Sequence, residues 1–265
     1  MVFAMAVFGL GQSFAQLKDG DYGIFNHVSA GVSVGTDGIG LQVAAPLTYH
    51  FAVRAGYQFF PKLKYNDTFD VGSDPAFTTS DVDIEGKLNI SSGNILFDYY
   101  PFSKSSFHVT AGAYFGTSKI LSVTNKNQFI SPDNWGTAGI QLAQGDSPMD
   151  KYTIVSDEKG NIQADLKVNG FRPYLGIGFG RAVPRKRIGC QFDLGIQFWG
   201  TPEVLTTLMY FDSAEGDFVR ANEKVNKNRI TRQDKDYQDV KDAIKTIEKV
   251  GVYPVLTFRL NGRIF

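Results

Sequence analysis

Apolar and polar residues alternate along several segments of the chain. Between Phe51 and Phe59, the residues Phe, Val, Ala, Tyr and Phe alternate with Ala, Arg, Gly and Gln. A period of two predicts β-strands, because successive side chains of a strand point to opposite faces. The alternation predicts eight strands, at about residues 26–35, 39–47, 50–61, 84–101, 106–124, 166–182, 187–199 and 252–265.

The connections between these segments alternate between short and long. Three short ones, at 46–49, 101–105 and 184–187, contain proline among polar residues, which is a turn composition. The others are a short one at 36–38 and long ones at 62–83, 125–165 and 200–251. Short turns at one end and long loops at the other are typical of membrane barrels. The predicted fold is therefore all-β, a membrane-spanning antiparallel up-and-down barrel of eight strands with long extracellular loops. Residues 200–212 could add strand and raise the count to ten.

One short helix is predicted before the last strand. Tyr237, Val240, Ile244 and Ile247 follow helical spacing, with Lys and Asp residues between them. The helix either folds over the barrel rim or docks a protein partner through the 200–251 loop.

The polar face of the strands carries both ionisable residues and many glycines. A soluble ligand-holding barrel would point its apolar face inward. A narrow membrane barrel points the polar face inward, and its long side chains then need vacant positions opposite them. Because buried charges must be paired, we predict a polar network that fills the lumen. Its expected members are Arg54, Asp98, Arg172, Asp193, Arg259, Gln58 and Gln191. The alternative is a charged constriction in a small pore, although eight strands leave room for little more than side chains.

Composition narrows the possible roles. The chain has 265 residues, and 27 Lys and Arg balance 27 Asp and Glu. A formal net charge of zero argues against nucleic acid as a partner, because phosphate binding needs a basic excess. The single cysteine, Cys190, excludes an intrachain disulfide. No run of eighteen apolar residues occurs, so no transmembrane helix is expected.

The N-terminus is interpreted as an export signal. Residues 1–15 are mostly apolar and end on small residues suited to cleavage after Ala15. The usual positive segment before the apolar stretch is missing, which indicates either a truncated signal or, as the alternative, a buried N-terminal strand. Residues 16–265 would then form a single barrel domain.

With these features the chain resembles the small outer-membrane β-barrel family, the OmpA-type transmembrane domain and single-domain porin-family barrels. The resemblance covers most of residues 26–265 and includes a last strand that ends in Phe265. It implies a bacterial outer-membrane location with extracellular loops and periplasmic termini, among lipid and lipopolysaccharide. It also implies that Phe265 is the signal read by the outer-membrane assembly machinery. Phe265 departs from the usual pattern, because its parity is that of Arg259 and Arg263 rather than that of the apolar face.

Candidate catalytic and metal-binding residues are sparse. His27-Val28-Ser29 is similar to the His-x-Ser pair of the outer-membrane lipid A deacylases, but both residues fall on the lumen parity. His50 and His108 lack neighbouring ligands at metal-binding spacing. The acidic 62–83 loop lacks the EF-hand spacing and is expected to meet cations bound to lipopolysaccharide.

We therefore expect no cofactor, no metal and no enzymatic activity. The expected role is envelope structure, surface interaction or service as an accessory barrel of a larger complex. A narrow porin-like channel for small solutes is the first alternative. A loop-borne lipid-modifying enzyme or protease is the second.

Overall fold

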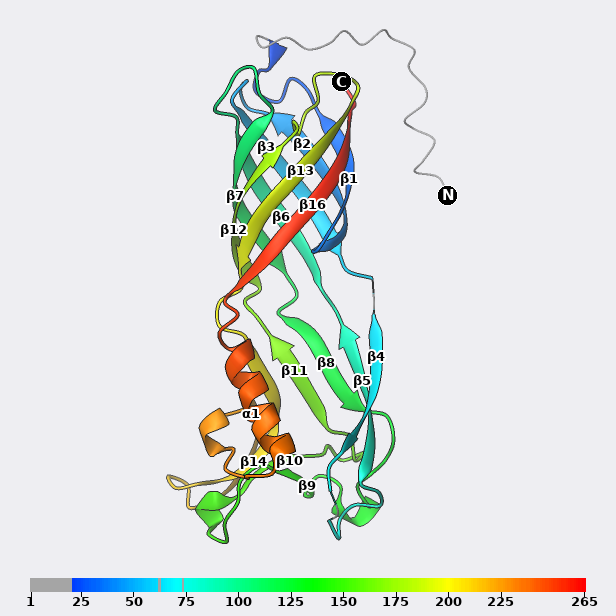
Figure 1. Cartoon of the computed structure of the whole chain (residues 1–265), viewed down its shortest axis with the longest axis vertical. Coiled ribbons are helices and arrows are strands. Elements are labelled where there is room, and N and C mark those ends of the chain that lie inside the picture. Colours follow the sequence, from blue (N-terminus) through cyan, green and yellow to red (C-terminus); the bar gives the residue numbers. More distant parts are fainter. Residues whose placement is uncertain (1–20, 62, 73) are drawn as a thin grey trace.

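A computed structural model describes residues 21–265 apart from 62 and 73. The expected export signal, residues 1–15, lies outside the described residues. The described chain is all-β with one α-helix, and its strands form a closed barrel followed along the long axis by an open sheet (Figure 1). None of the helices in the described part has both the length and the apolar character needed to cross a membrane.

Eight antiparallel strands close the barrel. In chain order they are β1 (Ser29–Gly35), β2 (Gly38–Pro46), β3 (Phe51–Phe59), β6 (Ser91–Tyr99), β7 (Phe107–Gly116), β12 (Phe171–Phe179), β13 (Ile188–Phe198) and β16 (Val252–Arg263). Each pairs with its neighbours in the order β1-β16-β13-β12-β7-β6-β3-β2, and β1 with β2 closes the ring. The predicted eight-stranded up-and-down barrel is confirmed.

The two ends of the barrel differ. Residues 47–50, 100–106 and 180–187 connect strands at one end, which we call the short-turn end. The C-terminus lies at this end as well (Figure 1). At the opposite end, three connections continue into further strands. The fourth, between β1 and β2, consists of residues 36 and 37 alone.

The long connections form a second sheet, which we call the extension. Its strands are β4 (Lys64–Asp70), β5 (Asp81–Leu88), β8 (Lys119–Asn125), β9 (Gly139–Gln141), β10 (Tyr152–Val155), β11 (Gln163–Lys167), β14 (Glu203–Asp212) and β15 (Asp217–Lys224). Three 3-10 turns accompany them, at η2 (Pro132–Asn134), η3 (Pro148–Asp150) and η4 (Lys227–Arg229). The order is β4-β5-β8-β11-β14-β10-β9, with β15 paired to β14. The extension does not close into a ring.

Three predicted strands are wrong in their length. The segments 84–101, 106–124 and 166–182 each divide into two strands, with breaks at 89–90, 117–118 and 168–170. These breaks lie where the chain passes from the barrel into the extension. The closed barrel fixes the tilt of its strands, whereas the open sheet does not, so the wall changes geometry there. Alternation of residues continues across the break and hides it from the sequence.

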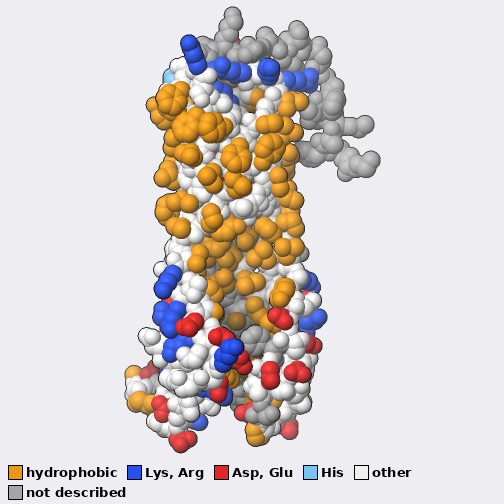
Figure 2. All heavy atoms as spheres, in the orientation of Figure 1, with side chains coloured by type: hydrophobic (Ala, Val, Ile, Leu, Met, Phe, Trp, Pro, Cys, Tyr) orange, Lys and Arg blue, Asp and Glu red, His pale blue; other side chains and the backbone are white. Residues whose placement is uncertain are grey.

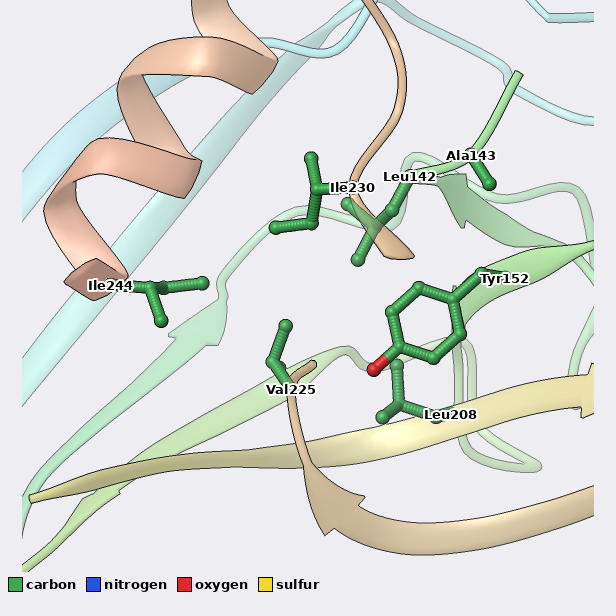
Figure 3. Close-up of a cluster of buried hydrophobic side chains, with 7 residues drawn as sticks. All are labelled: Leu142, Ala143, Tyr152, Leu208, Val225, Ile230 and Ile244. Carbon is green, nitrogen blue, oxygen red and sulfur yellow. The ribbon is translucent and has the colours of Figure 1, made fainter. Parts of the chain in front are cut away.

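The helix α1 (Lys235–Ile247) confirms the helix predicted before the last strand. It packs on the extension rather than over the barrel rim (Figure 1). Ile244 is buried against a core that belongs to the extension itself (Figure 3). The other members of this core are Leu142, Ala143, Tyr152, Leu208, Val225 and Ile230. Tyr237 and Val240 of the predicted stripe cover its edge. The extension thus has an apolar core of its own, separate from the barrel.

Candidate functional site: the barrel lumen

The two faces of the barrel wall have opposite character. Along β12, the apolar residues Leu175, Ile177 and Phe179 are exposed on the outside, whereas Arg172 and Tyr174 are buried inside. The same alternation runs through β13, β16 and β3. Apolar side chains consequently cover the outer surface of the barrel (Figure 2). The polar face therefore points into the lumen.

The centre of the lumen holds an ion-pair network around Arg54. Its Nη2 lies 2.7 Å from Asp98 Oδ1, and its Nη1 lies 3.0 Å from Asp193 Oδ2. Thr110 donates a hydrogen bond of 2.7 Å to the same Asp98 oxygen. Arg54 and Asp98 are both 0% exposed. The guanidinium of β3 thus joins carboxylates from β6 and β13 across the interior, with each terminal nitrogen donating to a different carboxylate.

Asp193 gathers further partners. His108 Nε2 lies 2.7 Å from Asp193 Oδ1, and His108 Nδ1 lies 3.2 Å from the Ser106 carbonyl oxygen. Arg259 of β16 also pairs with the Asp193 carboxylate. The two arginines and the two aspartates balance in charge, which is what makes a buried cluster of this kind tolerable.

A chain of amides continues the network. Asn261 Nδ2 donates to Gln191 Oε1 at 3.2 Å, and Gln42 Nε2 donates to Asn261 Oδ1 at 3.0 Å. These contacts link β13, β16 and β2. The three side chains are buried, so polar groups cross the lumen without reaching water.

Glycines supply the room for the long side chains. Gly178 of β12 lies directly between His108 and Asp193 in register. A Cβ at Gly178 would stand 2.6 Å from His108 Nε2 and closer still to Asp193 Oδ1. At Gly176, a Cβ would stand 2.6 Å from the Tyr174 hydroxyl. The glycines on the lumen face therefore act as vacant positions opposite bulky groups.

Apolar layers enclose the polar network on both sides. Toward the extension lie the buried residues Leu96, Tyr114, Tyr174 and Val255, followed by Ile120, Val168 and Trp199. Toward the short turns lie Tyr22, Ala44, Ala52, Tyr100, Ala182 and Val183. The lumen side chains are buried along the whole barrel. An uninterrupted water path through the barrel is therefore absent among the described residues.

Two of the residues expected in the network lie apart from it. Arg172 is 1% exposed near the extension end of the lumen, at the level of Tyr114, and its Nε and Nη2 have no hydrogen-bond partner. Gln58 is buried, but its Oε1 has no partner either. Arg54, Asp98, Asp193, Arg259 and Gln191 are brought together.

The network also contains groups that the sequence reasoning left out. Thr110 and Asn261 share the inward parity, and this signal could have found them. The same signal places His108 on the polar face, although His108 was not among the expected members of the network. Asp37 carried no such signal, because it lies in the turn between β1 and β2. Its carboxylate turns into the lumen, where the Thr257 hydroxyl donates to it at 3.3 Å and Tyr114 at 3.5 Å.

The remaining candidates lie at the short-turn end. Ser29 donates its hydroxyl to the Ala182 carbonyl oxygen at 2.6 Å, and no described hydrogen bond joins it to His27. No cluster of three potential metal ligands occurs in the part of the chain that the structure describes. The strand β16 ends at Arg263, and Phe265 is exposed beyond it, with its carbonyl oxygen accepting a hydrogen bond from the Val28 amide at 3.3 Å. Ile264 and Phe265 are both exposed, so the alternation of buried and exposed side chains along β16 does not continue to Phe265.

Comparison with known proteins yields distant matches of structure alone. No family model and no curated protein matches the sequence. The crystal structure of CarO2 from Acinetobacter baumannii has 17% identity over 89% of this chain and 98% of that chain, with a TM-score of 0.47. The crystal structure of Acinetobacter baumannii CarO has 17% identity over 92% and 99%, with a TM-score of 0.45. Likenesses this distant assign neither a family nor a function to the chain.

Proposed function

We propose that the chain is an integral outer-membrane β-barrel protein that acts without catalysis, as part of the envelope structure and as a carrier of a surface-exposed binding element. The observation that carries the proposal is the combination of an apolar outer wall with a buried, charge-balanced lumen. In water the apolar wall would expose a large apolar surface. In lipid the same wall faces acyl chains, and the closed ring of strands pairs the spanning backbone groups.

Aromatic residues support the membrane assignment, because they form a row near each end of the barrel wall. Phe51 stacks on Tyr99 with ring centroids 4.9 Å apart, and this pair lies near the short turns. Phe115 and Phe171, with centroids 5.2 Å apart, lie near the extension. Strands of nine residues at the usual rise and tilt place such rows about 20 Å apart along the barrel axis. This spacing suits the two interfaces of an outer membrane.

A structural role is favoured over a channel because the lumen is filled. The Arg54 network is closed by apolar layers on both sides, so an ion would have to displace paired charges to pass. We place the short turns and the termini in the periplasm and the extension outside the cell, as in barrels whose long loops are extracellular. In this orientation the exposed acidic residues of β4 and β5 would meet cations bound to lipopolysaccharide. Phe265 would be presented to the assembly machinery.

Within the segment 200–251, we expect a protein partner to bind at β15 rather than at α1. The apolar stripe of α1 is already covered by the core of the extension. Phe218 of β15 remains exposed beside Phe211, with ring centroids 5.6 Å apart. Exposed aromatic residues on an outer strand suit binding of a protein surface.

Two measurements test the proposal. A folded barrel should migrate differently on SDS gels before and after boiling and should be recovered with outer membranes. Reconstituted into planar bilayers, the protein should give no single-channel conductance under conditions where a porin in the same lipid conducts. Recovery in the soluble fraction without a heat-dependent shift would overturn the membrane assignment. Steady conductance steps would replace the structural role with a channel.

A further inference from the structure

A basic pocket lies at the short-turn end of the barrel. It has a volume of about 290 Å³ and lies between the turn after β6 and the turn after β12. Its charged lining consists of Lys104, Arg181, Arg185 and Lys186, and no carboxylate lines it among the residues that the structure describes. Ser105 and Ser106 add hydroxyl groups from the first turn. Lys and Arg gather at this end of the molecule on the face that Figure 2 shows. Lysine, arginine and serine side chains are the groups that bind phosphate in proteins, so this lining suits a phosphate group.

Arg181, which lines this pocket, is a buried cation with one nitrogen that has no hydrogen-bond partner. Its guanidinium carbon lies 4.3 Å from the ring centroid of Tyr49 and 4.7 Å from that of Tyr100. Its Nη1 donates to the Tyr49 carbonyl oxygen at 3.1 Å. The side chain is 8% exposed, yet its Nη2 has no hydrogen-bond partner. Among the described residues no carboxylate pairs with Arg181. A buried cation of this kind stabilises an incoming anion, because the cost of its desolvation has already been met by folding.

An apolar groove begins where the basic pocket ends. The groove has a volume of about 580 Å³ on the outer wall, and its floor consists of small residues, Ala30, Ala55 and Gly262. These residues belong to one row across the sheet, in which Ile188 pairs with Gly262, Gly262 with Ala30, Ala30 with Val43, and Val43 with Ala55. The outward side chains of Val32, Leu41 and Leu260 form its walls.

Ile188 lines both the basic pocket and the apolar groove. The two sites therefore adjoin at this side chain, and together they match an amphiphile with an anionic head and an apolar tail. We propose that an anionic glycerophospholipid occupies them, with its phosphate on the four cations and one acyl chain along the groove. The inference rests on the proposed function, since it requires the barrel wall to lie in lipid. In the proposed orientation this end meets the periplasmic leaflet, where glycerophospholipid rather than lipid A is the neighbouring lipid.

Native mass spectrometry of the delipidated full chain in detergent tests the proposal. Titrated phosphatidylglycerol should bind as a single adduct more tightly than phosphatidylethanolamine, whose ammonium group the lysines repel. The double variant Lys104→Ala/Lys186→Ala should weaken binding about thirtyfold, because each basic residue near an anionic lipid is worth about 1 kcal/mol. The double variant Ala30→Leu/Ala55→Leu should weaken binding by filling the groove.

Matched controls separate the site from general effects. Lys235→Ala/Lys249→Ala removes two exposed lysines at the two ends of α1, outside the short-turn end, and Ala111→Leu adds the same bulk to another exposed position of the wall, on β7. Both should bind as the parent does. Inorganic phosphate at the lipid concentration should not displace phosphatidylglycerol, because it fills the head pocket alone.

Three results would overturn the proposal: unchanged binding in both site variants, displacement by inorganic phosphate, or tighter binding of lipid A than of phosphatidylglycerol. A heat-dependent shift on SDS gels, recorded for every variant, shows that the barrel has folded. Loss of that shift in the parent would overturn the proposed function instead, so the two failures are distinguishable.

Discussion

His108 and Asp193 meet over a glycine. They lie on β7 and β13, which are separated by β12, and their side chains come within 2.7 Å of each other above Gly178. A contact between residues two strands apart requires that the strand between them carry no side chain at that point. The lumen therefore depends on glycine as much as on charge.

Asp98→Ala should destabilise the barrel by about 3–5 kcal/mol, because Arg54 would lose one of its two carboxylates while still buried. Urea unfolding in lipid vesicles, followed by the fraction of heat-shifted protein, measures the change. Asp81→Ala removes an exposed aspartate of the extension and serves as the control. A loss of stability no larger than that of the control would mean that Asp98 does not hold Arg54.

Gly178→Ala should cost about 1–3 kcal/mol, because the added methyl group would overlap His108 and Asp193. The same unfolding assay applies. Gly93→Ala is the matched control in β6, since its Cβ would lie 3.7 Å from the nearest atom, which is an ordinary contact. If both glycines tolerate alanine equally, the close approach at Gly178 does not constrain the lumen.

Arg172→Met should leave stability unchanged or raise it by about 1–3 kcal/mol, because the buried guanidinium has two nitrogens without partners. Arg54→Met should lower stability, since it leaves Asp98 and Asp193 without their shared cation. The comparison of these two variants distinguishes a paired from an unpaired lumen arginine. Equal losses in both would show that Arg172 has a partner that stabilises it.

The sequence predicted the barrel well, because alternation reports the direction of each side chain and the network is built from inward residues. Arg54, Asp98 and Asp193 could be selected in this way. Alternation does not report which inward residues reach one another. Arg172 and Gln58 were therefore included although no described hydrogen bond joins them to the network. Asp37 lies in a turn, where the inward and outward alternation of a strand does not apply.

The extension was harder to predict than the barrel. Its strands come from three long connections and pair across them, as when Leu166 of β11 pairs with Val204 of β14. The strands β10 and β11 follow one another in the chain but do not pair with each other. The strand β10 pairs with β9 and β14, whereas β11 pairs with β8 and β14. Pairing between distant segments leaves no local pattern in the sequence.

Ile244→Ala should destabilise the extension by about 2–5 kcal/mol, because it opens a cavity in the core beneath α1. Limited proteolysis of intact protein in vesicles should then cut within the segment 200–251 at a lower protease concentration, while the heat-dependent shift of the barrel persists. Asp239→Ala, on the exposed side of the same helix, is the control. Simultaneous loss of the heat-dependent shift would contradict the separation of the two cores.

Acid should loosen the extension through Asp165. Burial raises the pKa of this carboxyl, but hydrogen bonds from Lys119, Ser122 and Gln163 outweigh it and hold the pKa below its ordinary value. A depressed pKa contributes stability above the unfolded-state value of about 3.9, and that contribution is lost as the pH falls through the lower folded-state value. Protease resistance of the extension should therefore fall below about pH 4. Asp165→Asn should be less resistant at neutral pH and should show a smaller change with acid. An unaltered pH profile in this variant would assign the acid response to other groups.

The seam between β1 and β16 sets a condition on biosynthesis. Ser29 pairs with Arg263, so the first strand of the ring finds one of its two neighbours in the last strand of the ring, far along the chain. Until that strand is present β1 has a free edge, and the apolar wall has no closed surface to present to lipid. The ring can close only after β16 has been synthesised, so an outer-membrane barrel of the proposed kind would reach its membrane with these strands still unassembled.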